Sequence, residues 1–287
     1  MKHIIVPIDF SKESLNGIKM AVTLSKHIPC HIQLVFVQEK VKDYARYSLV
    51  EERQDAKKKL DKLVLEYSPK MGKESRLSYI VKKGKVYQEV VGQAEAFEDS
   101  MVVCSTHGAS GFEALFIGSN AFRIVTATDR SVITIRHGCC HKDIKRIVLP
   151  IDITADSRQK VPQTAELATL FNAEVHVVGV SSIGSEDIEA KIKAYTYQVC
   201  EFLKANKIEV KQEFIVGDNI TDVIIEYAKR VEADMISIMS EQSTDLSNFV
   251  LGSYAQQMLN KANVPVLIIH PKELFVMGSF RTQGILY

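Results

Sequence analysis

The sequence has 287 residues, of which 46% are hydrophobic and 25% are charged, and its net charge is +1. These values are typical of a globular protein, and without a domain-scale basic excess we expect no nucleic-acid interface. No apolar run reaches the roughly 18 residues that a membrane span needs, and the five cysteines are irregularly spaced, so we expect a cytoplasmic protein with reduced thiols and no membrane contact.

In the first half of the chain, apolar runs alternate with amphipathic segments. The first apolar run is typical of a buried strand rather than of a signal peptide, and Ser11 is well placed to cap the helix that follows. The expected strands are Ile4–Ile8, Ile32–Val37, Leu77–Val81, Met101–Cys104 and Val132–Ile135. The expected helices lie near Ser11–Lys26, Val41–Met71, Val86–Phe97 and Ser119–Ala127. Near-continuous apolar strands separated by helices are typical of a parallel sheet that is covered on both faces.

A short segment, His137 to Asp143, links the two halves. It is polar apart from Cys139 and Cys140, and its shortness predicts that the halves pack together. Together with His137 and His141, the two thiols form a set of soft ligands that zinc or copper could use. Their spacing is not that of a closed zinc site, so we prefer the interpretation of an exposed linker.

The second half repeats the first. The segment KHIIVPID at 2–9 returns as KRIVLPID at 145–152, an offset of 143 residues. Near the end of each half, Gly118-Ser119 matches Gly252-Ser253 at an offset of 134, so the second half is shorter in its middle. Its expected strands are Ile147–Ile151, Glu174–Val180, Val210–Ile215, Met235–Met239 and Val266–Ile269. Pro162 is expected to kink or restart the helical pattern after Thr154.

The predicted fold class is therefore α/β: two tandem doubly wound five-stranded parallel-sheet domains with helices on both faces, related by a pseudo-two-fold axis. We expect domains at 1–137 and 144–271, and an apolar C-terminal extension at 272–287 that packs across the halves. Val132–Ile135 and Val266–Ile269 would each be an exposed apolar edge, so we expect them to meet in an intramolecular pseudo-dimer. Whether whole chains also form a homodimer stays open.

Three features of the first half converge on the carboxyl edge of the expected sheet, where ligands of such folds bind. Asp9 ends the first strand, a small-residue loop follows Cys104, and Gly118-Ser119-Asn120 opens the last helix. Glycine lets the backbone approach an anion, and the first N–H groups of the helix point at it. The Ser119 hydroxyl could cap the helix or donate to a phosphate oxygen. Spacing alone leaves open the alternative that these glycines are simple turn formers.

The loop itself resembles a known motif. Ser105-Thr106-His107-Gly108, followed after nine residues by Gly118-Ser119, is similar to the nucleotide loop of the universal stress protein family, whose pattern is Gly, two residues, Gly, nine residues, Gly-Ser/Thr. The resemblance covers residues 1–137 and 144–271 and includes both strand-end Pro-Ile-Asp segments, so the chain is similar to a tandem member of that family. Ser105 stands where the family has its first glycine, which adds a side chain close to the phosphate path.

The resemblance implies a site for ATP or AMP in the first half, and Mg²⁺ beside the phosphates is compatible with it. In such a site Asp9 would hold the ribose or an associated metal, and the backbone of Val37 would meet the adenine. The nucleoside would be lined by Cys104 and Ser105, and the phosphates would be surrounded by Gly108, Gly118, Ser119 and Asn120.

The second half departs further from the motif. Its aligned loop is Met239-Ser240-Glu241-Gln242, which lacks both glycines, and Glu241 adds a negative charge near the phosphate path. Asp152 and Gly252-Ser253 remain, but the needs of the fold alone could explain them. We therefore expect nucleotide to bind mainly in the first half.

The expected function is that of a stress-response regulatory or sensor protein that binds a nucleotide and has protein partners of unknown identity. The alternative is a ligand-independent interaction scaffold with vestigial pockets. An enzyme is less favoured, because the sequence has no Walker A lysine, and neither a partner carboxylate nor a nucleophile elbow supports a catalytic His107. At most, slow ATP hydrolysis is expected.

Overall fold

The computed structural model describes residues 2–39, 46–106, 117–136, 143–154, 156–182, 184–240 and 251–271. Gly108, His107, the linker cysteines and the extension at 272–287 lie outside these residues, so the expectations that rest on them stay predictions. Among the described residues, no helix combines the length and the hydrophobicity needed to cross a bilayer.

The first half folds as its alternation of apolar and amphipathic segments predicts. Its strands are β1 (His3–Pro7), β2 (His31–Gln38), β3 (Arg76–Lys83), β4 (Ser100–Ser105) and β5 (Ser131–Ile135). Its helices are α1 (Lys12–Ser25), α2 (Arg46–Tyr67), α3 (Val86–Glu95) and α4 (Ser119–Ala127), with the short 3-10 helix η2 (Ser68–Lys70) after α2. The Ser11 hydroxyl accepts a hydrogen bond from the Ser14 amide at 3.0 Å, which confirms Ser11 as the N-cap of α1.

The second half follows the same order with one local difference. Its strands are β6 (Arg146–Ile151), β7 (Glu174–Ser181), β8 (Val210–Val216), β9 (Met235–Met239) and β10 (Val266–Ile269). Its helices are α5 (Val161–Phe171), α6 (Glu186–Ala205), α7 (Ile220–Arg230) and α8 (Ser253–Lys261), and the 3-10 helix η3 (Asp156–Arg158) precedes α5. Pro162 lies in the first turn of α5, where a missing N–H costs no helical hydrogen bond, so it restarts the helix rather than kinking it.

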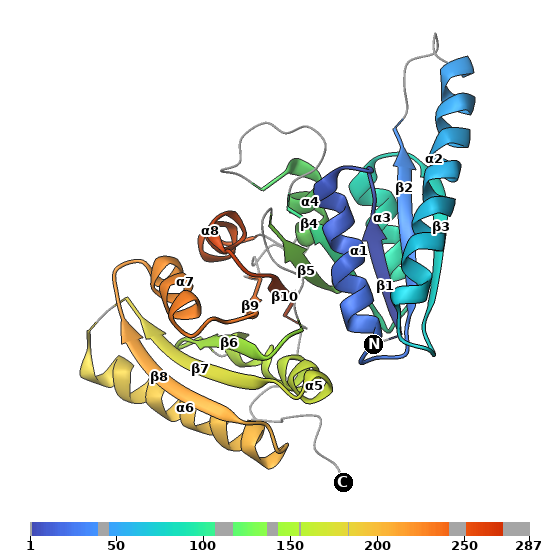
Figure 1. Ribbon diagram of the computed structural model, residues 1–287. Coiled ribbons are helices and arrows are strands. Elements are labelled where there is room, and N and C mark those ends of the chain that lie inside the picture. Colours follow the sequence, from blue (N-terminus) through green and yellow to red (C-terminus); the bar gives the residue numbers. More distant parts are fainter. Residues whose placement is uncertain are drawn as a thin grey trace.

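All the strands belong to one 10-stranded sheet, in the order β3-β2-β1-β4-β5-β10-β9-β6-β7-β8 (Figure 1). Pairing within each half is parallel, whereas β5 and β10 pair antiparallel with Ile133 opposite Leu267. Both of these side chains are fully buried, so each last strand covers the apolar edge of the other. The expected meeting of the last strands is confirmed, and it joins the two predicted sheets into one. Equivalent strands of the two halves follow one another in the same order from either edge of the sheet to its centre. The two-fold axis itself stays a prediction.

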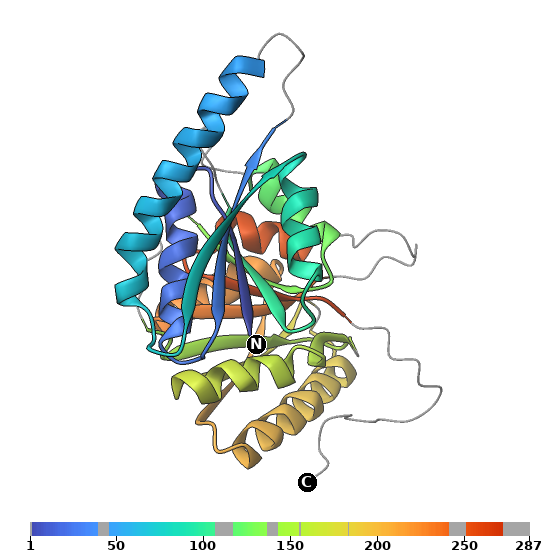
Figure 2. The same ribbon diagram turned by 90° about the vertical axis from the view of Figure 1, so that its right-hand side faces the viewer.

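Helices cover both faces of this sheet. Figure 2 shows the first-half strands between α1 and α2 on one side and α3 on the other. Helices α5 and α6 share one apolar core with α1 and α2, and this core continues past the junction of β5 and β10. Helices α3, α4, α7 and α8 pack on a second core on the opposite face. The two halves therefore share their cores as well as their sheet.

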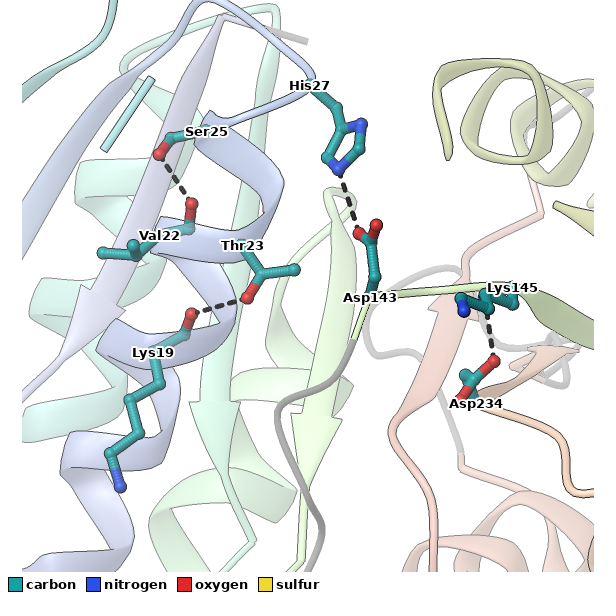
Figure 3. Close-up of polar contacts among 8 residues, drawn as sticks. All are labelled: Lys19, Val22, Thr23, Ser25, His27, Asp143, Lys145 and Asp234. Carbon is teal, nitrogen blue, oxygen red and sulfur yellow. Dashed lines mark hydrogen bonds and ion pairs between the residues drawn. The ribbon is translucent and has the colours of Figure 1, made fainter. Parts of the chain in front are cut away.

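Polar contacts also join the halves near the end of α1 (Figure 3). The Nε2 atom of His27 lies 2.9 Å from Oδ1 of Asp143, and the His27 ring packs on Phe171 with the ring centroids 4.2 Å apart. The Ser131 hydroxyl donates to the side-chain oxygen of Gln163 at 2.7 Å. These contacts hold the start of the second half against the first, in agreement with the packing that the short linker predicts.

Candidate functional site

The carboxyl edge of the first-half sheet contains the point at which the strand order reverses. Strand β1 pairs with β2 on one side and with β4 on the other, and doubly wound folds bind ligands at such a point. Asp9 follows β1, Val37 lies near the end of β2, and Cys104 and Ser105 end β4. The structure thus brings these four predicted site residues to one edge.

The Asp9 carboxylate is held in a tight turn between β1 and α1. Its Oδ1 atom accepts hydrogen bonds from the amide of Ser11 at 3.0 Å and from the hydroxyl of Ser11 at 2.6 Å. Phe10 lies between them with φ 65°, a left-handed conformation that is uncommon for a bulky residue, and its ring packs near that of Phe36. Asp9 itself is exposed, so the turn presents its carboxylate at the edge of the sheet.

Val37 and Cys104 are buried in the core that α3 and α4 cover. Burial raises the pKa of the Cys104 thiol to about 12, so this side chain stays neutral. Ser105 is less buried and pairs with Ile135 at the end of β4.

The start of α4 is tied directly to the end of β4. The Gly118 amide donates to the carbonyl oxygen of Thr106 at 2.6 Å. Gly118 is the N-cap of α4 with φ −62° and ψ 145°, and no side chain of the described residues caps this helix. Ser119, which the sequence suggested as a cap, is instead the first helical residue and is exposed together with Asn120. A helix start without a side-chain cap leaves N–H groups for an anion.

Side chains that could hold a metal ion do not gather at this edge within the described part of the chain. There, no three His, Cys, Asp or Glu residues come together as a potential metal site. The His137, Cys139, Cys140 and His141 cluster lies outside the described residues.

The second half reproduces the strand-end turn of the first. Asp152 Oδ1 accepts hydrogen bonds from the Thr154 amide at 2.7 Å and from the Thr154 hydroxyl. The Thr154 hydroxyl oxygen also accepts from the Ser157 amide at 3.3 Å, which matches the bond between Ser11 and Ser14 at the offset of 143. The repeat therefore preserves the geometry of the strand-end carboxylate as well as its sequence.

A cavity of about 530 Å³ lies at this edge of the second half. Its wall comes from the carboxyl ends of β6, β7 and β9, from η3 and the residue that precedes α5, and from α6, α7 and α8. The polar side chains that line it are those of Asp152, Thr154, Ser157, Lys160, Ser181, Ser182, Ser240 and Tyr254. Its volume is within the range of small-molecule sites, although the sequence predicts only a degenerate pocket here.

Lys160 is the unexpected residue of this cavity. It is only 3% exposed although it carries an ammonium group. Burial lowers its pKa to about 8, against the smaller opposing effect of the Asp152 charge. Its Nζ atom donates a hydrogen bond to the Ser157 carbonyl oxygen. The local sequence does not distinguish Lys160 from a surface lysine, but the repeat does, because the offset of 143 aligns it with Gly17.

Tyr254 and His270 also bring buried polar atoms to this edge. The Tyr254 hydroxyl has no hydrogen-bond partner among the described residues. Burial, assisted by the charge of Asp152, raises its pKa, so the phenol stays protonated. The hydroxyl of Ser240, on the cavity wall, lies 2.8 Å from Nδ1 of His270, and burial lowers the pKa of that ring to about 4. His270 is therefore neutral at pH 7.

Comparison with known families supports the duplication. The family model described as the universal stress protein family matches residues 1–136 and again residues 143–270. Among curated proteins, a universal stress protein of Methanocaldococcus jannaschii is 27% identical to this chain over 141 residues. The match spans 44% of this chain and 81% of that protein.

Solved structures resemble the whole chain. A universal stress protein from Archaeoglobus fulgidus gives a TM-score of 0.78 at 18% identity and covers 93% of this chain and 98% of its own. A putative universal stress protein from Pseudomonas aeruginosa gives a TM-score of 0.62 at 14% identity, with 94% of each chain covered. At these identities the likeness establishes the fold, and the ligand has to be argued from the residues.

Proposed function

Because the chain belongs to the universal stress protein family, we propose that it is a nucleotide-binding regulatory or sensor protein of the stress response. ATP or AMP binds mainly to its first half. The observation that carries this proposal is that the Asp9 carboxylate and the start of α4 lie at the sheet edge where the strand order reverses. The carboxylate suits ribose hydroxyls, and the helix start suits phosphates.

Each predicted residue has a role in this proposal. Asp9 accepts hydrogen bonds from the ribose, and Ser11 fixes its position. The backbone of Val37 meets the adenine, and the neutral Cys104 and neighbouring Ser105 line the nucleoside. The residues around the phosphates, with or without Mg²⁺, are Gly108, Gly118, Ser119 and Asn120.

The second-half edge is less suited to a nucleotide. By the offset of 134, Tyr254 stands at the position of Asn120, and Met239 at that of Ser105. Bulkier side chains thus occupy places where the first half has small polar ones. This difference supports nucleotide binding mainly in the first half.

A regulatory role is favoured over rapid catalysis. Fast phosphoryl transfer needs cationic groups that stabilise charge on the transferred phosphate. The predicted first-half site contains no lysine or arginine, and its Cys104 thiol is neutral. A bound nucleotide would therefore persist long enough to report its own concentration.

The test uses the full chain. Mass spectrometry of small molecules released from the purified protein, followed by calorimetric titration of ATP and AMP, should show an adenine nucleotide and one dominant site per chain. Asn120→Tyr, which introduces the second-half residue, should weaken that site at least tenfold. If no nucleotide is released and neither ATP nor AMP binds at millimolar concentration, the result contradicts this proposal and supports the alternative of a ligand-independent interaction scaffold.

A further inference from the structure

The cavity of the second half is associated with a late helix start. In the first half, α1 begins at Lys12, directly after its cap. The offset of 143 would place the equivalent start at residue 155, but η3 follows from residue 156 and α5 begins only at Val161. Thr154, Ser157 and Lys160, which belong to this delayed start, all line the cavity.

Lys160 occupies a place at which the first half has little room for a side chain. A Cβ atom on Gly17 would lie 3.0 Å from Cγ1 of Val6 and 3.2 Å from the carbonyl oxygen of Val103. Both distances are shorter than an ordinary van der Waals contact. The buried lysine is therefore a feature of the second half's own packing and not of the shared fold.

Buried hydroxyl groups hold the backbone of Lys160 in place. The Thr164 hydroxyl donates to the Lys160 carbonyl oxygen at 2.8 Å and lies 2.8 Å from the Ser237 hydroxyl. Both hydroxyl side chains are fully buried. By the repeat they stand where the first half has Ala21 and Val103. A satisfied polar network of this kind rigidifies the residue that it holds.

The cavity contains donors that lack acceptors. Among the described residues, Nζ of Lys160 bonds only the Ser157 carbonyl, and no described carboxylate lies within ion-pair distance of it. The buried Tyr254 hydroxyl has no partner in the same part of the chain. Buried donors without acceptors are unfavourable. A ligand with anionic oxygen atoms would satisfy both.

The charges of the cavity favour a ligand with one negative charge. Among the described lining residues, Lys160 is the only cation and Asp152 the only anion. A phosphate dianion would be repelled by Asp152 and would have a single ammonium group to neutralise it. A monocarboxylate carries half that charge, so Asp152 repels it less and the single ammonium group of Lys160 can neutralise it.

The rest of the wall is mainly apolar. Ile188 and Ile192 come from α6, Ile220 begins α7, and Val180 and Ile238 lie at the ends of β7 and β9. A cavity of about 530 Å³ has room for a small organic molecule. Methylene groups that such a wall removes from water contribute favourably to binding.

We propose that the second half binds a small organic monocarboxylate with an apolar body. Its carboxylate accepts hydrogen bonds from Lys160 and Tyr254, and its body packs against the isoleucines of α6 and α7. This site uses no residue of the first half and goes beyond the proposed nucleotide binding. One chain thereby binds two chemical classes of small molecule.

Calorimetric titration of octanoate into the full chain at pH 7 tests this proposal. We expect one saturable site, at least tenfold weaker binding of 1-octanol, and at least tenfold weaker octanoate binding in Lys160→Met. The control is Lys229→Met, an exposed lysine in the last turn of α7, which should change the affinity less than twofold. Equal binding of octanol, equal binding by Lys160→Met, or no saturable binding of octanoate, hexanoate or phenylacetate would each overturn the proposal.

Two further measurements cover a failure of Lys160→Met to fold. Tyr254→Phe, which removes only the hydroxyl group, should weaken octanoate binding about threefold. In the unmodified protein, octanoate affinity should fall as the pH rises through about 8, because Lys160 loses its charge there. Asp152 and Tyr254 are the other titratable described residues of the wall, and the raised pKa of Tyr254 keeps it neutral in this range. Affinity that is independent of pH from 7 to 9.5, or displacement of octanoate by AMP at stoichiometric concentration, would refute the assigned ligand class.

Discussion

The carboxyl ends of the strands in the two halves share a turn around an aspartate but differ in the side chains that pack behind that turn. Asp9 and Asp152 accept the same pair of hydrogen bonds from the residue two positions later. Behind that turn the first half packs a helix closely at Gly17, whereas the second half has the buried ammonium group of Lys160. A duplicated domain can thus keep the backbone frame of a strand-end turn and change the side chains behind it, because the frame depends on main-chain geometry and the chemistry of a site on a few side chains.

The strand junction that joins the two halves should be the most sensitive part of the molecule. Replacing both Ile133 and Leu267 with lysine places two like charges opposite each other in a fully buried strand pair. We expect a loss of roughly 4 kcal/mol or more of stability, with expansion seen by small-angle scattering. Val50→Lys with Leu65→Lys, at two exposed positions of α2, is the control. Unchanged scattering and stability in the junction variant would show that the halves do not depend on this pairing.

Lys160 should impose a stability cost that the first half does not carry. Its pKa of about 8 lies below the usual 10.5, so the charged form is disfavoured by roughly 3 kcal/mol in the folded state at about 1.4 kcal/mol per unit. Lys160→Met should therefore raise the free energy of unfolding at pH 7, by up to this order. Denaturant titrations of both proteins measure the difference.

The pH dependence of that difference gives an independent check of its cause. Between about pH 8 and 10.5 the unfolded lysine keeps its proton while the folded one has lost it, so wild-type stability rises with pH across this window. The Lys160→Met protein lacks this rise, and the two curves should converge. A variant that is less stable than wild type at pH 7 would indicate that the ammonium group is well paired in the native protein.

Gly118 and Gly252 form a matched pair for the nucleotide proposal. They are the N-caps of α4 and α8, with φ of −62° and −61°, so the backbone accepts valine at both. In Gly118→Val the branched side chain should block the approach of the phosphates and weaken AMP binding at least 100-fold, which is about 2.7 kcal/mol of binding free energy. Gly252→Val should leave AMP affinity within twofold. The reverse pattern would move the nucleotide to the second half.

The smallest expected effect comes from removing the hydroxyl group that bonds the strand-end aspartate in each half. Ser11→Ala removes the N-cap of α1 and should cost about 1 kcal/mol of stability. It also removes the hydroxyl that donates to Asp9, so AMP should bind severalfold more weakly. Thr154→Ala makes the same change in the second half, before a short 3-10 helix, and should leave AMP affinity unchanged. Thermal unfolding and AMP titration of both variants measure this. Equal effects on AMP would mean that Asp9 is not part of the nucleotide site.

Much of the fold can be predicted from the sequence, because both halves of the repeat show the same pattern of strands and helices. The apolar edges of the last strands predict their meeting, which the pairing of Ile133 with Leu267 confirms. The local sequence does not predict the burial of Lys160, since a lysine beside a proline-containing helix start is usually solvated. The repeat singles it out by aligning it with Gly17, but its burial also depends on the late start of α5. Of the two roles that the sequence leaves open for Ser119, the cap is not observed, because Gly118, one residue earlier, already has the extended backbone of an N-cap.

The most direct test of the account is a crossed titration. AMP and octanoate are each titrated calorimetrically into the wild-type chain, Gly118→Val and Lys160→Met at pH 7. The account predicts that Gly118→Val loses AMP but keeps octanoate, and that Lys160→Met loses octanoate but keeps AMP. If either variant loses both ligands while remaining folded, or if Lys160→Met loses AMP alone, the two halves do not carry separate sites of different chemistry.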